Sequence, residues 1–246
     1  MNFLLGGRLG DLIHELYVVK NTPGRHNLFI TDNRSLHSDG FMLPIGETCD
    51  ELWPILKEQD YMGTVQPMPY DILGFAENQT GEYVNLNMWR RYVYSKSWTP
   101  LLASTFNVPE TGGAWITLPK IAGWEEKIIF HCSVYPARRG HWAIPIDKYH
   151  GDRSVFVGTE EEYRLFGYEM QFYQPKDLKE HFDIINSCKF FIGNQSAPLA
   201  MAHAMDVPRL AILNKADEIA YRGEEKYSNN FSWISDSDFF FEGINY

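Results

Sequence analysis

Three short segments of the chain combine glycines, small polar residues and charged side chains in patterns that suit phosphate or sugar chemistry. The first is GGRLGD at residues 6–11, where a short apolar run meets a helical pattern. Glycines let backbone amides approach a ligand, and the start of a helix attracts negative charge. Asp11 is therefore either a residue that caps this helix or a carboxylate used in catalysis, and both interpretations stay open.

The second segment is FIGNQSAP at residues 191–198, where an apolar run ends at a glycine and Pro198 begins a helical pattern of small residues. The amides at this helix start, together with the Ser196 hydroxyl, would form an anion site. An ordinary strand-to-helix turn is the alternative interpretation.

The third segment is HCSVYPARRGHW at residues 131–142, which carries the adjacent arginines Arg138 and Arg139. Paired guanidinium groups in a loop rich in small residues indicate diphosphate recognition. A solvated pair of surface charges is the alternative.

Strands and helices alternate along both halves of the chain. Strands are expected at residues 2–6, 27–31, 70–75, 127–134, 154–159, 170–174, 189–194 and 208–213. Helices are expected at residues 11–20, 49–59, 86–104, 144–150, 159–168, 175–188 and 197–205. This alternation predicts an α/β protein of βαβ units with mainly parallel sheets. Residues 108–127, which are rich in Gly and Pro and show little periodicity, predict a linker between two lobes. We place these lobes at 1–118 and 119–246.

Composition narrows the class of protein. The 246 residues carry a net charge of −10, which argues against a nucleic-acid partner. There is no run of 18 apolar residues that would predict a membrane span. The three cysteines lack CxxC spacing and are typical of a reducing compartment. Because the first residues also lack the pattern of a signal peptide, we expect a cytoplasmic protein.

Four segments together carry a resemblance to a known family. They are GDLIHELYVV at 10–19, FHCSVYPARRGHW at 130–142, VFVGTEEE at 155–162 and FIGNQSAPLAMAHAMDVPRLAIL at 191–213. In this order they resemble the heptosyltransferase family of glycosyltransferases. The resemblance implies the GT-B fold, in which two Rossmann-like lobes enclose a cleft. It also implies inverting transfer of a sugar from a nucleotide-diphosphate donor to an acceptor hydroxyl. No metal and no cofactor are implied, since the nucleotide sugar is itself the donor substrate.

The resemblance also implies a role for each matching residue. Asp11 falls on the acid proposed as general base for the acceptor hydroxyl, and Gly10 beside it is expected to belong to the donor site. Ser133, Arg138 and Arg139 fall in the loop that holds the donor diphosphate. The residues that would cradle the same phosphates at the last helix start are Asn194, Gln195, Ser196, Ala197 and Pro198.

The chain departs from the family pattern at three positions of this last helix. Gln195 stands where the family has an acidic residue, Ala197 replaces its glycine, and Ala200 replaces its usual histidine. These departures leave two alternatives open. One is a non-catalytic protein that binds a nucleotide sugar or a glycan, and the other is a sugar-nucleotide epimerase or hydrolase of the same fold.

Weaker patterns occur elsewhere in the chain. Asp32 follows the second expected strand, as the ribose-binding acid of a nicotinamide-dependent oxidoreductase would, but the GxGxxG spacing is missing and a turn residue is favoured. Asp236 and Asp238 form a D-x-D string, the metal-binding signature of a different glycosyltransferase fold, although no central strand precedes them. The aromatic-rich residues 231–246 are expected to pack against the first lobe rather than form a dimer contact.

Overall fold

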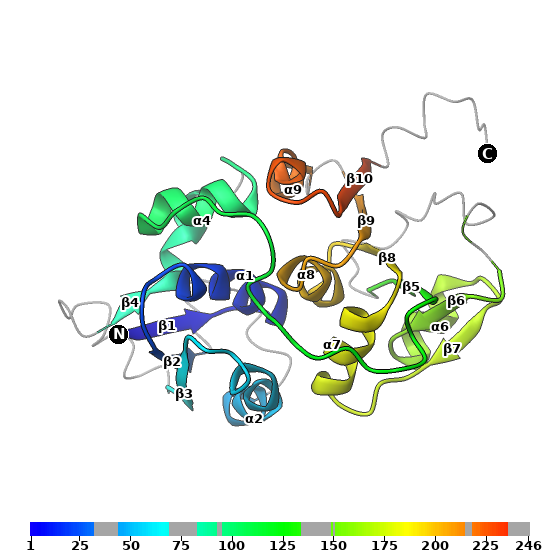
Figure 1. The fold of residues 1–246 in the computed structure, drawn as a ribbon, viewed down its shortest axis with the longest axis horizontal. Helices are drawn as coiled ribbons and strands as arrows, with labels where there is room; N and C mark the ends of the chain where they lie inside the picture. The colour runs from blue at the N-terminus through cyan, green and yellow to red at the C-terminus, as the bar shows by residue number, and fades with distance from the viewer. Residues whose placement is uncertain are drawn as a thin grey trace.

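The computed structural model describes residues 1–31, 44–68, 83–92, 95–133, 149, 151–214 and 218–235. These residues form two parallel β-sheets with helices packed against them, one sheet in each half of the molecule (Figure 1). The predicted α/β class with mainly parallel sheets is therefore confirmed.

The first lobe is built on a parallel sheet with the strand order β3-β2-β1-β4. Its strands are β1 (Asn2–Gly6), β2 (His26–Thr31), β3 (Met62–Pro67) and β4 (Val84–Asn85). Its helices are α1 (Leu9–Lys20), α2 (Ile45–Leu56), the 3-10 helix η1 (Leu86–Tyr92) and α4 (Trp98–Phe106). The order reverses between β1 and β4, so the turn from β1 into α1 lies where such sheets bind ligands.

The second lobe is built on a parallel sheet with the order β10-β9-β8-β5-β6-β7. Its strands are β5 (Ile128–His131), β6 (Ser154–Val157), β7 (Gln171–Tyr173), β8 (Phe190–Asn194), β9 (Arg209–Leu213) and β10 (Phe231–Ser235). Its helices are α6 (Glu160–Phe166), α7 (Leu178–Ser187), α8 (Ala197–Ala204), α9 (Glu218–Tyr221) and the 3-10 helix η3 (Glu224–Lys226). This order is that of a doubly wound Rossmann sheet, with its switch point between β5 and β8.

The structure differs from the sequence-based expectations in three places. Residues 62–67, for which no strand was expected, form β3, an edge strand that pairs with β2. Residues 86–104 form η1 and α4 rather than one helix, with Pro100 in the first turn of α4, where its missing N–H costs nothing. Residues 231–235, for which no strand was expected, form β10 against β9. Because residues 236–246 lie outside the described residues, the expected packing of this segment on the first lobe stays a prediction. Outside the described residues lie the expected strand at 70–75 and, apart from Tyr149, the expected helix at 144–150.

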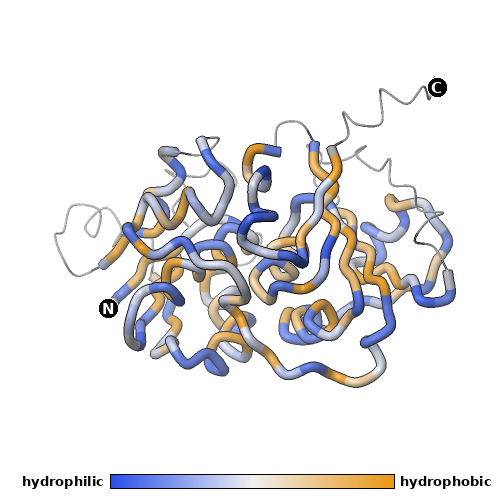
Figure 2. Tube along the Cα trace, turned by 45° about the horizontal axis from the view of Figure 1, so that its top comes forward, coloured by the Kyte–Doolittle hydropathy of each residue, from blue (hydrophilic) through white to orange (hydrophobic). Residues whose placement is uncertain are grey.

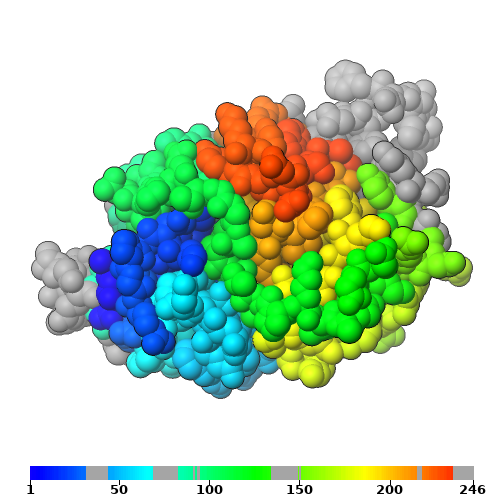
Figure 3. All heavy atoms as spheres, viewed as in Figure 1, coloured from blue at the N-terminus to red at the C-terminus, as the bar shows by residue number. Residues whose placement is uncertain are grey.

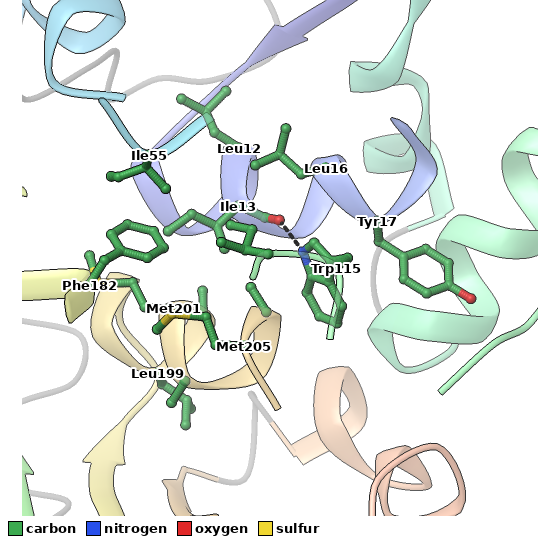
Figure 4. Packing of buried hydrophobic residues seen from close by; sticks show 14 of the residues in the cluster. Leu12, Ile13, Leu16, Tyr17, Ile55, Trp115, Phe182, Leu199, Met201 and Met205 are labelled. Carbon is green, nitrogen blue, oxygen red and sulfur yellow. Dashed lines mark hydrogen bonds between the residues drawn. The ribbon is translucent and has the colours of Figure 1, made fainter. Parts of the chain in front are cut away.

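The two lobes share a hydrophobic core. Helices α1 and α8 lie side by side at the centre of the molecule (Figure 1), and apolar residues concentrate along the inner strands and helices (Figure 2). Figure 4 shows Ile13 of α1 directed toward Phe182 of α7 and Met201 of α8, with Leu12 on the opposite side of α1. The indole Nε1 of Trp115 donates a 2.8 Å hydrogen bond to the Ile13 carbonyl within this core.

The connection between the sheets, residues 107–127, contains no helix or strand and crosses one face of the molecule (Figure 3). It is hydrogen-bonded to both lobes. Tyr17 of α1 donates its hydroxyl hydrogen to the Pro109 carbonyl at 2.9 Å, and the Trp115 amide donates to the Ala204 carbonyl at 2.8 Å. The boundary that we placed between residues 118 and 119 falls inside this connection and stays a prediction.

Candidate functional site

A cavity of about 660 Å³ lies between the lobes, and the ends of both sheets open into it. Its walls come from residues that directly follow β1, β5, β6, β7 and β8, which are the carboxyl ends of parallel strands, and from α2 and α4. The carboxyl ends of such strands are where open α/β sheets bind ligands. Its wall includes Arg8, Gly10, Asp11, Glu51, His131, Ser133, Glu162, His181, Gln195, Ser196, Ala197, Pro198 and Ala200.

On the first lobe, the turn from β1 to α1 holds the Asp11 carboxylate at the cavity wall. The Asp11 Oδ2 atom accepts a 3.1 Å hydrogen bond from the Arg8 amide and a 3.3 Å charged hydrogen bond from the Arg90 Nη2 atom. Arg90 comes from η1, and its Nη2 also donates to the Gly6 carbonyl at 2.8 Å. Asp11 therefore does cap the helix, as one of the two interpretations held, and it also faces the cavity.

Behind this turn lies a second carboxylate, Glu15, with no exposed surface. Its Oε1 atom accepts a 2.8 Å hydrogen bond from the Trp89 indole, and its Oε2 atom accepts a 3.3 Å bond from the Gly6 amide. The Arg90 Nη2 atom lies 3.7 Å from Oε1. Burial raises the pKa of Glu15 to about 8, against the lowering effect of the Arg90 charge and the indole.

On the second lobe, the start of α8 faces the cavity and has no side-chain cap. The Asn194 Oδ1 atom at the end of β8 accepts a 3.1 Å bond from the Ser133 amide after β5, which joins the two strands at the switch point. The Ser196 hydroxyl donates to the Asn194 carbonyl at 3.0 Å and so does not cap α8. The neighbouring helices α6 and α7, by contrast, are capped by Thr159 and Asp177.

Small residues bring the starts of α1 and α8 together. A Cβ atom on Gly10 would lie 3.7 Å from the Ala197 Cα atom and 3.9 Å from the Ala200 Cβ atom. The departures from the family pattern at 197 and 200 therefore lie where the two helices approach. The two helix starts, both positive ends of helix dipoles, meet in the same cavity.

Two histidines of the second lobe, His131 at the end of β5 and His181 on α7, also line the cavity. The Nδ1 atom of His131 is 3.0 Å from the Val157 carbonyl, which can only accept, so Nδ1 carries a proton. Its Nε2 atom lies 3.7 Å from Glu162 Oε1. His181 on α7 is partly buried, with its Nε2 atom enclosed, and burial, helped by the nearby His131, lowers its pKa to about 3. Its Nε2 atom has no hydrogen-bond partner among the described residues.

The structure brings most of the residues predicted for the site to one cavity. Those that line it are Gly10, Asp11, Ser133, Gln195, Ser196, Ala197 and Pro198. Asn194 is 2% exposed and supports the wall instead of lining it. Arg138 and Arg139, as well as Asp32, Asp236 and Asp238, lie outside the described residues. The roles given to all these residues stay predictions.

Sequence reasoning missed Arg8, Arg90, Glu162 and His181. Arg8 sits inside the GGRLGD segment and its position beside Asp11 was a usable signal. No local pattern marks Arg90, because it is separated from Asp11 by 79 residues and reaches it only through the fold. In the described part of the chain, no group of three or more His, Cys, Asp or Glu side chains is arranged to hold a metal ion. Across the same residues, no helix combines the length and apolar character needed to cross a membrane.

No family model and no curated protein matches the chain in sequence. Solved structures do match it in three dimensions. A glycosyltransferase family 9 protein from Veillonella parvula has a TM-score of 0.59 and 10% identity, over 97% of this chain and 87% of that one. E. coli heptosyltransferase WaaC with ADP has a TM-score of 0.56 and 14% identity, over 96% of this chain and 93% of that one. E. coli ADP-heptose LPS heptosyltransferase II has a TM-score of 0.56 and 12% identity, over 95% of this chain and 90% of that one. At these identities the similarity concerns the fold, so the chain has the two-lobed GT-B fold of the heptosyltransferases, as its sequence resemblance implied.

Proposed function

We propose that the protein is a glycosyltransferase that moves a sugar from a nucleotide-diphosphate donor to an acceptor hydroxyl, with inversion and without a metal ion. One observation carries the proposal: Asp11 and the start of α8 line the same cavity from opposite lobes, close to each other. A carboxylate opposite an anion site is the arrangement that inverting transfer needs. Proteins of this fold include WaaC, solved with ADP, which supports a nucleoside diphosphate as part of the donor.

The diphosphate would lie at the start of α8. The first amides of a helix carry partial positive charge, and in α8 the N-cap side chain does not occupy them. The start of α7 is a poorer candidate, because the Leu178 amide already donates to Glu51 Oε2 from the first lobe at 2.9 Å. Ser133 extends the α8 site to the end of β5.

Asp11 would act as general base in a single displacement. The acceptor hydroxyl proton passes to the Asp11 carboxylate while the acceptor oxygen forms a bond to the anomeric carbon. The bond between that carbon and the diphosphate oxygen breaks, and its electron pair leaves with the nucleoside diphosphate. The α8 amides stabilise the charge that develops on the departing group. Because the attack comes from the side opposite the diphosphate, the anomeric configuration inverts.

Binding is tested first, with ADP, UDP, GDP and CDP as probes in thermal unfolding and titration calorimetry. A ligand at 100 times its Kd stabilises the folded state by about 2.7 kcal/mol. Asn194→Asp keeps the acceptor for the Ser133 amide but adds a negative charge beside α8, so it should weaken binding of the preferred probe. Asn186→Asp, on α7, is the matched control, since the Asn186 side chain donates to the Leu118 carbonyl in the linker. If the natural chain and both variants bound the probe with equal affinity, the anion site would not lie at α8.

Catalysis is tested with the sugar derivatives of the preferred nucleotide and a panel of hydroxyl acceptors. Asp11→Asn should lower transfer by roughly 10²–10⁴-fold while nucleotide affinity is kept. Asp60→Asn, at an exposed carboxylate of the same lobe, is the control. Turnover of donor without any acceptor would favour a hydrolase or epimerase. Donor that is bound but stays intact would favour the non-catalytic alternative.

A further inference from the structure

We infer that Arg90 is a positioning residue for the proposed reaction: its guanidinium group fixes the Asp11 carboxylate from behind the β1–α1 turn. The inference rests on the proposed function for its kinetic consequence, but the geometry stands without it. Arg90 itself is not a residue of the cavity wall. It acts only through Asp11.

Arg90 is held in one place by several partners. Its Nη2 atom donates to the Gly6 carbonyl at 2.8 Å, and its Nε atom lies 3.4 Å from Asn87 Oδ1. The guanidinium carbon stacks 4.4 Å from the centre of the Trp89 ring. The Arg90 side chain is only 9% exposed, so solvent screens its charge weakly. A cation held this rigidly defines where a bonded carboxylate must lie.

The β1–α1 turn is shaped around this guanidinium. Gly7 has a φ of 104°, in the left-handed region, and a Cβ atom there would come within 1.9 Å of the Arg90 Nη2 atom. The same Cβ would be 2.9 Å from Asp11 Oδ2. A glycine is thus needed at the point where Arg90 and Asp11 meet.

Two donors reach Asp11 on the same oxygen. The Arg8 amide and the Arg90 Nη2 atom bond Oδ2, one along the helix axis and one from η1. Together they fix the rotation of the carboxylate toward the cavity, where a fraction of its surface remains exposed. A general base needs such a fixed direction, because a displacement of about 1 Å can cost roughly 10²-fold in rate.

Other charged residues also lie near Asp11 and Arg90. Glu15 lies one turn further along α1 and contacts Arg90 from the buried side. Arg8 precedes Asp11 at the start of the helix. The part of α8 that packs against this turn consists of Ala197 and Ala200, which carry no charge. Arg90 is therefore the cation that a buried and an exposed carboxylate share.

The test compares the position of the Asp11 carboxylate in crystal structures of the full-length natural chain and of its variants. Removing the guanidinium group in Arg90→Met removes one of the donors to Asp11 Oδ2, so the carboxylate should turn away from its position in the natural chain. Arg90→Lys keeps a donor and a positive charge, so its Asp11 carboxylate should be displaced less than that of Arg90→Met. Arg25→Met is the control, because Arg25 is an exposed arginine of the same lobe that bonds the Met62 carbonyl.

An unmoved Asp11 carboxylate in Arg90→Met, or an equal displacement in Arg25→Met, would overturn the inference. Loss of folding in Arg90→Met would be seen by circular dichroism, and Arg90→Lys then carries the comparison. Where transfer is measurable, Arg90→Met should also lower kcat by roughly 10²-fold and leave the ADP affinity unchanged. A chain that shows no transfer at all would refute the proposed function, while the crystal structures would still decide the role of Arg90.

Discussion

His181 makes the stability of this protein depend on pH in a way that can be calculated. The side chain lies on α7 with its Nε2 atom enclosed, and burial lowers its pKa from 6.5 to about 3. Between these two values the unfolded chain binds a proton that the folded chain excludes. Stability must therefore fall as the pH falls from 6.5 toward 3, and it is fully present above 6.5.

The size of this effect at pH 5 follows from the unfolded value. Each pH unit below 6.5 is worth about 1.36 kcal/mol while the folded imidazole stays neutral. At pH 5 the group therefore costs the folded state about 2 kcal/mol relative to pH 7.5. Any folded pKa well below 5 gives the same result, so the prediction does not depend on the value of 3. His14, which is also enclosed and has a pKa well below its usual value, adds to the loss in the natural chain.

The assay is urea unfolding, followed by circular dichroism at pH 7.5 and pH 5.0. His181→Gln cannot titrate, so its loss of stability between the two pH values should be about 2 kcal/mol smaller than that of the natural chain. Phe182→Leu, at the next residue of α7, is the control, because it lowers stability by a similar amount at both pH values. If His181→Gln and the natural chain lost the same stability, the histidine would be charged or solvated in the folded state and the reasoning would be refuted.

Two further predictions concern contacts that join distant parts of the chain. Glu224, which has no exposed surface, accepts hydrogen bonds from the amide and the hydroxyl of Thr99 on the other lobe. Burial alone would raise the pKa of Glu224, but its bonds with His203 and Thr99 outweigh burial and lower this pKa. Glu224→Gln should therefore cost about 1.5–3 kcal/mol, seen calorimetrically as a fall in Tm of about 2–4 °C per kcal/mol; an unchanged Tm would show that the charge is not used. Gly7→Ala should destabilise the fold and displace Arg90, whereas Gly46→Ala in α2, where a Cβ would meet nothing within 4 Å, should stabilise it by roughly 0.5–1 kcal/mol. Urea unfolding of the two alanine variants compares them, and equal effects would contradict the steric argument.

The sequence alone was informative wherever the determinants are local. The turns from β1 to α1 and from β8 to α8 each lie within about a dozen residues, with a glycine after an apolar run and a helix start directly after it. Such units can be recognised without knowing the fold, because the strand, the turn and the helix start are contiguous. Asp11 and Ser196 were found in this way, and the alternation of these units predicted the parallel sheets.

The hydrophobic pattern of the sequence did not predict the edge strands β3 and β10. β3 has the sequence MGTVQP, with a glycine and a proline that normally indicate a loop. It becomes a strand because β2 offers it a row of backbone partners, and a proline is tolerated at the end of an edge strand. β10 likewise owes its place to pairing with β9. An edge strand is determined by its neighbour as much as by its own residues.

The site was completed only by tertiary structure. The sequence of the β1–α1 turn supplied Asp11, but Arg90 reaches its carboxylate from 79 residues away, through the pairing of β1 with β4 and the direction of η1. His131 and His181 come together in the same way, from the end of one strand and the first turns of a helix fifty residues later. Local sequence determines which groups stand at the end of a strand, because that depends on a few adjacent residues. Packing decides which of these groups meet, because it depends on the whole core that α1 and α8 share.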